Sequence, residues 1–166
     1  MLISELKSLE EAVRRVLARG GRIVVVCIGN SLRGDDAFGP LVYEFLREEG
    51  VNSVINAEHA PENALGLLLR EKPSLLILVD AVKGRGRAGE LIVTRLSEAS
   101  SPLPLTTHSV PLDLLVRAVD LDPARVILVG VYASNFEFGV KPSVKVVKAA
   151  KLVAELLARV MATSLA

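Results

Sequence analysis

The chain has 166 residues, a net charge of +1 at pH 7 and a hydrophobic content of 51%, enough for the core of a single domain spanning residues 1–166. The nearly neutral charge and the few aromatic residues (four Phe, two Tyr, no Trp) exclude strong recruitment to nucleic acid or anionic lipid. The single cysteine, Cys27, excludes an intrachain disulfide and is expected to be an inert core thiol. Because the N-terminus lacks a signal-peptide core and no apolar run reaches the ~18 residues of a membrane span, we expect a cytoplasmic protein without membrane insertion.

From the N-terminus onwards, the apolar residues alternate between helical and strand-like patterns. An amphipathic helix is predicted first, and Gly20-Gly21 end it. The predicted helices are 4–19, 37–49, 61–70, 111–119 and 144–161. Short apolar runs rich in β-branched residues predict strands at 23–28, 51–57, 75–82, 90–96 and 125–133. A solvated glycine-rich turn is expected at 83–89, and loops at 97–109 and 135–142. This alternation predicts a three-layer α/β/α fold, with a mostly parallel, twisted sheet of about five strands and helices on both faces.

Polar residues at the carboxyl ends of the predicted strands form the candidate site, because ligands bind at this edge of parallel sheets. The residues at or after strand ends are Asp35, Asp36, Asp80, Asn135 and Glu137, and His108, in the long loop before a predicted helix, joins them as a candidate. The two adjacent acids follow the first strand, and Asp80 lies near the end of a run of aliphatic residues. The fold prediction therefore brings acids and an imidazole from distant parts of the chain to one edge.

The loop after the first strand has the outline of a phosphate-binding loop but not its chemistry. The dinucleotide fingerprint G-x-G-x-x-G needs a second glycine where this chain has Ser31, in Gly29-Asn30-Ser31-Leu32-Arg33-Gly34. The Lys-Ser/Thr pair of a P-loop is absent from the sequence. Asp35 and Asp36 would also repel a phosphate at the start of the next helix. We therefore expect neither a nucleotide phosphate nor any other organic cofactor.

Two acids and an imidazole on converging segments suit a divalent cation that keeps open coordination positions. Such a cation polarises a carbonyl or activates water. Simpler roles compete with this interpretation. Asp35 or Asp36 could cap the next helix, Asp80 could bond to loop amides, and His108 could be an ordinary hydrogen-bonded loop residue.

Six segments, in their order along the chain, resemble the successive motifs of the nickel–iron hydrogenase maturation endopeptidases. They are GNSLRGDDAFGP (Gly29–Pro40), HAPEN (His59–Asn63), LLILVDAV (Leu75–Val82), AGEL (Ala88–Leu91), TTHSVPL (Thr106–Leu112) and VILVGV (Val126–Val131). The second and fifth are most similar to the branch that serves formate-hydrogenlyase-type and related membrane-bound hydrogenases. The resemblance runs from Arg22 to about Leu157, so residues 1–20 are an extra N-terminal helix.

The resemblance implies an endopeptidase that removes a short C-terminal peptide from the large-subunit precursor of a hydrogenase. It also implies that nickel, supplied by the loaded precursor, is the recognition element. The metal-binding and catalytic positions of the family fall on Asp36, Asp80 and His108, and Asp35 takes a capping or supporting role. The chain departs from many members at Ala37, where they have glycine, and in the loop 135–142, which could adjust the choice of precursor.

The implied mechanism has the metal polarise the scissile carbonyl or its bound water while a carboxylate acts as base. A serine nucleophile is disfavoured because the sequence has no G-x-S-x-G elbow. Two other classes of function stay open at this point. The same three residues could serve a non-catalytic nickel or metal chaperone, and the fold could serve a nucleotide-binding α/β module. The sequence is silent on oligomeric state.

Overall fold

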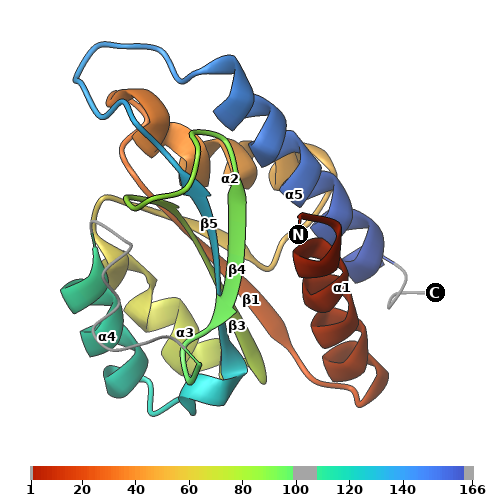
Figure 1. Cartoon of the computed structure of the whole chain (residues 1–166). Helices are drawn as coiled ribbons and strands as arrows, with labels where there is room; N and C mark the ends of the chain where they lie inside the picture. Colours follow the sequence, from red (N-terminus) through yellow and green to blue (C-terminus); the bar gives the residue numbers. More distant parts are fainter. Residues whose placement is uncertain (1, 99–107, 163–166) are drawn as a thin grey trace.

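The computed structural model describes residues 2–98 and 108–162, in which a five-stranded sheet lies between two layers of helices (Figure 1). The strands are β1 (Ile23–Ile28), β2 (Val54–Glu58), β3 (Leu75–Val82), β4 (Leu91–Arg95) and β5 (Val126–Tyr132). Their order across the sheet is β2-β1-β3-β5-β4. All neighbouring pairs are parallel except β4 and β5, which are antiparallel. The predicted three-layer fold with a mostly parallel sheet is confirmed.

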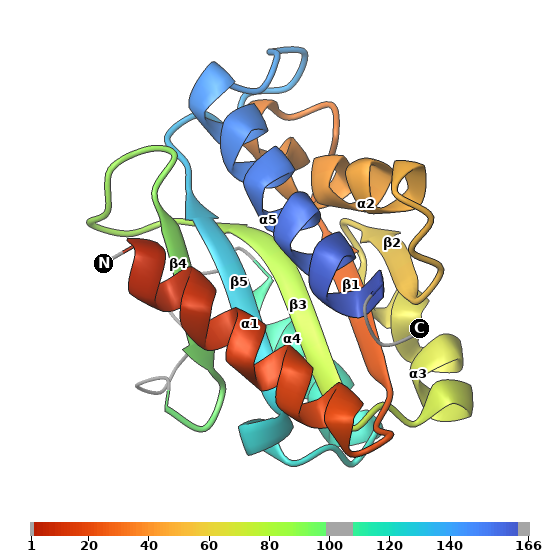
Figure 2. The ribbon, with the colours of Figure 1, turned by 90° about the vertical axis from the view of Figure 1, so that its right-hand side faces the viewer.

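Three helices cover one face of the sheet and two cover the other (Figures 1 and 2). The first group is α1 (Leu2–Ala18), α2 (Phe38–Glu48) and α5 (Val144–Ala162), and the second is α3 (Leu65–Glu71) and α4 (Ser109–Ala118). Single 3₁₀ turns precede α2, α3 and β5; they are η1 (Gly34–Ala37), η2 (Pro61–Ala64) and η3 (Pro123–Arg125). Each helix and strand predicted above is present. Most of the loop predicted at 97–109 lies outside the described residues.

Two predicted elements begin later than expected: α3 begins at Leu65 and not at Pro61, because Pro61–Ala64 form the 3₁₀ turn η2, and β2 begins at Val54 and not at Val51. The backbone N–H of Val51 donates to the carbonyl of Leu46, 3.0 Å away, and so closes the end of α2. The pairing of β2 with β1 starts only at Val54, opposite Val25. The prediction was wrong here because a β-branched residue was read as part of the strand.

The long apolar runs form strands because both faces of the sheet are covered. All eight residues of β3 are buried, and they alternate between two cores. Leu75, Ile77 and Val79 pack beneath the layer that contains α1, α2 and α5. Leu76 and Leu78 pack beneath the layer that contains α3 and α4. Cys27 is fully buried in the first core, and burial raises the pKa of its thiol, so the expectation of an inert core cysteine agrees with the structure.

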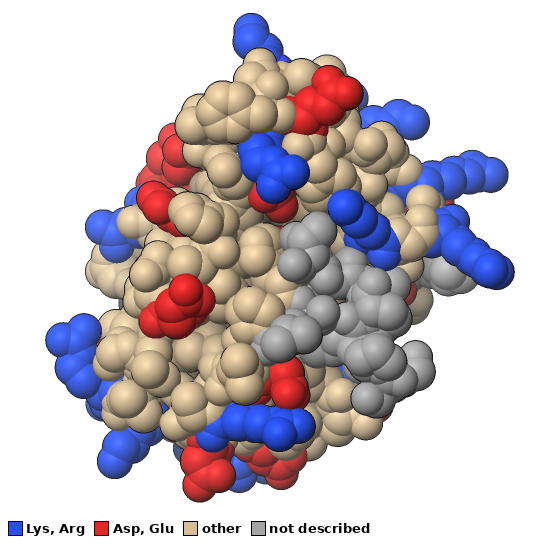
Figure 3. Space-filling view, turned by 90° about the vertical axis from the view of Figure 1, so that its left-hand side faces the viewer, with Lys and Arg blue, Asp and Glu red and all other residues tan. Residues whose placement is uncertain are grey.

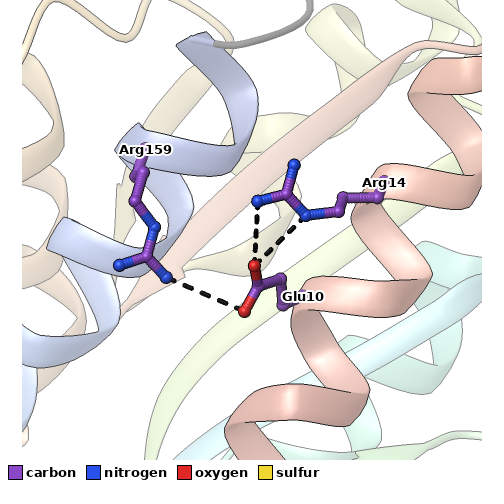
Figure 4. A network of polar contacts seen from close by, with 3 residues as sticks. All are labelled: Glu10, Arg14 and Arg159. Atoms are coloured by element: carbon purple, nitrogen blue, oxygen red, sulfur yellow. Dashed lines mark hydrogen bonds and ion pairs between the residues drawn. The ribbon is translucent and has the colours of Figure 1, made fainter.

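The extra N-terminal helix is part of the same core. Leu9, Ala12 and Val13 of α1 are buried in the cluster that α5 and the sheet also form. At the surface the Glu10 carboxylate accepts two hydrogen bonds from Arg14, at 2.9 and 3.1 Å, and pairs with Arg159 of α5 at 3.7 Å (Figure 4). α1 is therefore joined to α5 by an apolar face and by an exposed ion-pair network.

The strand order creates a crevice between the ends of β1 and β3. From β1 the chain continues to the edge strand β2, whereas from β3 it continues towards β4 and β5 on the opposite side. The loops that follow β1 and β3 therefore diverge, and such a switch point is where open α/β sheets bind ligands.

Within the described part of the chain, none of the helices has the length and apolar character of a membrane span.

Candidate active site

A pocket of about 350 Å³ lies at the carboxyl end of the sheet, beside the loop that follows β1. Its lining residues are Asn30, Arg33, Asp36, His59, Lys83, His108 and Phe136. They come from the loops after β1, β2, β3 and β5 and from the start of α4. Two of the three residues proposed from the sequence, Asp36 and His108, line this pocket directly.

The loop after β1 returns on itself because Gly29 allows a close backbone approach. Gly29 has φ +143°, and a Cβ atom there would collide with the backbone carbonyl oxygen of Asp36. The N–H of Asn30 donates to Oδ2 of Asp36 at 2.9 Å, so the backbone that leaves β1 fixes this carboxylate. A register shift between Cys27 and Ile28 in the pairing of β1 with β2 lies just before this turn.

Asp36 is a buried acid with unused bonding capacity. It is 3% exposed, and its Oδ1 has no hydrogen-bond partner among the described residues. Neither η1 nor α2 has a side-chain cap, so the competing N-cap role is wrong for Asp36. A buried carboxylate oxygen without a partner is costly in a folded chain unless a ligand completes it.

Asp35 takes a structural role across the molecule. Its Oδ1 accepts from the backbone N–H of Ser143 at 2.7 Å, and its own N–H donates to the carbonyl of Asn135 at 2.7 Å. The predicted capping of the next helix is wrong, because Asp35 fixes the segment before α5 instead. Asn135 also belongs to this support: its side-chain oxygen accepts from the N–H of Glu137 at 3.1 Å. Neither Asn135 nor Glu137 lines the pocket.

Asp80 and His108 form a hydrogen-bonded pair behind the pocket. Nδ1 of His108 lies 2.9 Å from Oδ2 of Asp80, whose side chain is wholly buried in β3. Burial raises the pKa of Asp80 to about 6, although the bond to His108 acts in the opposite direction and the charge of Asp36 adds to the rise. The hydrogen bond to Asp80 raises the pKa of His108. This bond, and not one to loop amides, is the main side-chain contact of Asp80.

The two acids and the imidazole do not form a ready-made metal centre. In residues 2–98 and 108–162, no group of three or more His, Cys, Asp or Glu is arranged to hold a metal ion. The Asp80–His108 hydrogen bond occupies Oδ2 and Nδ1, while Oδ1 of Asp80 and Oδ1 of Asp36 are buried without a hydrogen-bond partner among the residues that the structure describes. The oxygen donors suit a divalent cation.

The remaining pocket residues were not identified as site residues from the sequence. The carbonyl of Phe136 accepts from Nε of Arg33 at 3.2 Å, and the Lys83 ammonium lies 4.8 Å from the centre of the Phe136 ring. Phe136 thus positions two cations beside a buried acid. His59 belongs to a segment quoted above, but no spacing marked it, and Lys83 was read only as part of a solvated turn. The position of Lys83 directly after β3 was the feature of the sequence that could have marked it as a site residue.

The electrostatics of this side of the molecule are mixed. Figure 3 shows the face covered by α3 and α4, where basic and acidic side chains are interspersed over a largely uncharged surface. This distribution agrees with the net charge of +1.

Solved structures of hydrogenase maturation proteases have the same arrangement. The NiFe hydrogenase maturation protease HycI from Thermococcus kodakarensis matches over 90% of this chain and 98% of its own, with a TM-score of 0.73 and 28% identity. A crystal structure of a hydrogenase 3 maturation protease matches 81% of this chain and 88% of its own, with a TM-score of 0.70 and 28% identity.

The sequence comparisons define the family. Residues 41–160 match the model of the HycI hydrogenase maturation proteases, and the chain belongs to this family. The hydrogenase 3 maturation protease of Escherichia coli is 33% identical over 110 residues, which are 65% of this chain and 70% of that protein. A putative hydrogenase maturation protease of Methanocaldococcus jannaschii is 27% identical over 128 residues, or 70% of this chain and 75% of that protein.

The family confirms the resemblance found in the sequence and makes the chain a peptide-bond hydrolase. Neither a non-catalytic chaperone nor a nucleotide-binding module fits this membership. Asp80 and His108 lie inside the matched range and Asp36 lies just before it. The roles of these three residues rest on their geometry and on the motifs.

Proposed function

We propose that this chain removes a short C-terminal peptide from the nickel-loaded large-subunit precursor of a NiFe hydrogenase. The observation that carries the proposal is the hydrogen bond between the buried Asp80 and His108 beside Asp36, at the switch point of a maturation-protease fold. A pocket of about 350 Å³ admits a few residues of an extended chain and not a whole domain. We expect the reaction to take place in the cytoplasm, as the sequence predicts.

Nickel is part of the substrate in this proposal, and Asp36, Asp80 and His108 are its ligands. The unpartnered Oδ1 atoms of the two acids support this assignment, because nickel binding would satisfy both buried oxygens. Imidazole and carboxylate are suitable ligands for this ion. The nickel of the precursor would thereby position the scissile peptide in the pocket, and a precursor without nickel would lack this anchor.

The chemical step is hydrolysis of one amide. The oxygen of water bonds to the scissile carbonyl carbon, a proton of this water passes to a base, and the leaving nitrogen takes up a proton as the C–N bond breaks. We assign the role of base to a carboxylate of the site, as the family motifs imply. His108 links Asp80 to the pocket, and Asp36 holds the substrate.

The decisive experiment mixes the protein with nickel-loaded and nickel-free precursor and follows the intact mass of both. We expect the loss of a C-terminal peptide from the loaded form alone. Equal trimming of both forms would remove nickel from recognition. Binding of the loaded precursor without any loss of mass would indicate a chaperone, and digestion of an unrelated unfolded protein would indicate a general peptidase.

A further inference from the structure

Exposed apolar side chains gather at one side of the pocket. Among the described residues, eight large hydrophobic side chains are exposed, and four of them form what we call the apolar rim: Leu32, Phe138, Val140 and Val144. Their exposed fractions are 58%, 73%, 37% and 69%. The chain has only four Phe, and two of them, Phe136 and Phe138, lie in the loop 135–142. Such a concentration marks an interaction surface more often than isolated exposed residues do.

The backbone beneath the rim is fixed by hydrogen bonds between the two segments that carry it. The N–H of Gly139 donates to the carbonyl of Leu32 at 2.7 Å, and the N–H of Gly34 donates to the carbonyl of Val140 at 3.0 Å. The buried Asp35 carboxylate adds the bond to the N–H of Ser143 described above. The rim is therefore organised before any partner binds, which lowers the entropic cost of docking.

The rim is continuous with the pocket through neighbouring residues. Leu32 precedes Arg33, and Phe138 lies two residues after Phe136; Arg33 and Phe136 both line the pocket and are hydrogen-bonded to each other. Figure 1 shows the connection between β5 and α5 projecting beyond the carboxyl end of the sheet, on the side where β1 leads into α2. A polypeptide with its scissile bond in the pocket must leave the pocket over its edge.

We propose that the apolar rim is the docking surface for an apolar segment of the precursor polypeptide that flanks the scissile bond. This inference rests on the proposed function and adds a second recognition element to it. The rim binds chain and not metal, so it contributes affinity for precursor with and without nickel. Apolar side chains of the segment bury Phe138 and Leu32, while the pocket residues act on the bond itself.

The test uses the full chain with serine at the rim and the large-subunit precursor from the same genome as probe. The double variant Leu32→Ser/Phe138→Ser should raise KM for the nickel-loaded precursor at least tenfold, with kcat within about twofold of wild type. The single variant Phe138→Leu should keep most of the wild-type affinity, because leucine retains apolar surface at this position although it lacks the ring. The matched control is Leu69→Ser, since Leu69 is 49% exposed on α3 and belongs to neither surface.

The possible outcomes separate this inference from the proposed function. If the wild-type chain trims the precursor and the double variant keeps its KM, the rim is not a docking surface. A loss in kcat with unchanged KM would also contradict docking. If the wild-type chain fails to trim the precursor at all, the proposed function falls first. The unfolding temperature of each variant serves as the control. If it equals that of the wild type, a change in KM is not caused by a loss of fold.

Discussion

Oδ2 of Asp80, at the end of β3, lies 2.9 Å from Nδ1 of His108, at the start of α4. The two residues are 28 positions apart, and their bond joins the sheet to the helix layer at the base of the pocket. Burial raises the pKa of the Asp80 carboxyl group, and the hydrogen bond to His108 opposes that rise. This pair gives the site a measurable pH signature.

We expect the metal-free chain to lose stability as pH rises through the titration of this pair. Burial raises the pKa of Asp80 from 3.8 to about 6, so between these values the folded state binds more protons than the unfolded state. The protonated Asp80 therefore favours the folded state fully below pH 3.8, and this stabilisation is lost as the pH rises through about 6. The difference between the two pKa values corresponds to roughly 3 kcal/mol in the free energy of unfolding. The raised pKa of His108 acts in the same direction above its ordinary value of 6.5.

Urea unfolding of the wild type and Asp80→Asn between pH 4 and pH 8 measures this effect. Asparagine does not titrate, so the free energy of unfolding of the variant should fall less over the window from 4 to 6. Parallel curves for the two proteins would show that Asp80 titrates at its ordinary value.

The two adjacent acids should respond differently to replacement. Asp36→Asn keeps an acceptor for the N–H of Asn30 but removes the charge in the pocket, so we expect an intact fold and no cleavage. Asp35→Asn keeps an acceptor for Ser143 and should cleave within about tenfold of wild type. Asp35→Ala leaves that N–H without its partner and should lower the free energy of unfolding by about 1–3 kcal/mol.

Cleavage of nickel-loaded precursor, followed by intact mass, and thermal unfolding of each variant test this division. His108→Ala, which deletes the imidazole at the pocket, should be as inactive as Asp36→Asn. Full activity of both Asp36→Asn and His108→Ala would overturn the site, and inactivity of Asp35→Asn would place Asp35 in the chemistry.

Gly29→Ala should damage both the fold and the site. Its φ of +143° disfavours alanine, and the new Cβ would collide with the carbonyl of Asp36. We expect a loss of about 1–3 kcal/mol in stability and a larger loss of cleavage, because the Asp36 carboxylate moves. Gly50→Ala is the matched control: φ is +84° there, but nothing lies within 4 Å of the added Cβ.

Gly50→Ala should therefore cost about 1 kcal/mol of backbone strain and leave cleavage unchanged. The comparison isolates the contact with Asp36 from the strain of positive φ. Equal activity of the two variants would show that Gly29 serves the turn and not the carboxylate.

The fold was predictable because its signals are local. The runs that became β1 and β3 are apolar throughout, which happens when a strand is buried on both faces, and the predicted bounds 23–28 and 75–82 match the structure. The gathering of Asp36 and Asp80 followed from the rule that strand ends meet at one edge of a parallel sheet, whereas His108 was assigned by the family motif. Val51 shows the limit, because a residue with strand propensity closes a helix instead.

The rest of the site depends on contacts between segments far apart in sequence. Asp35 and Ser143 are 108 positions apart, and Arg33 and Phe136 are 103 positions apart. No periodicity or spacing encodes such pairs, because each forms only after the loops are positioned by the sheet. For the same reason Lys83 looked like one more charge in a solvated turn, although its ammonium lies over the Phe136 ring.

The attachment of α1 gives a last prediction, in which neighbouring residues have unequal effects. Leu9 is fully buried between α1, α5 and the sheet, so Leu9→Ala should lower the free energy of unfolding by about 2–5 kcal/mol. Glu10, one residue later, pairs with Arg14 and Arg159 at the surface, where water screens the charges (Figure 4). Glu10→Gln should therefore cost less than ~1 kcal/mol, and less still in high salt.

Urea unfolding of both variants at low and high salt compares the two contributions on one helix. A large loss for Leu9→Ala that does not depend on salt shows that α1 belongs to the core through its apolar face. If Glu10→Gln lowers the free energy of unfolding as much as Leu9→Ala does, the ion pairs and not the apolar face attach α1 to the rest of the chain.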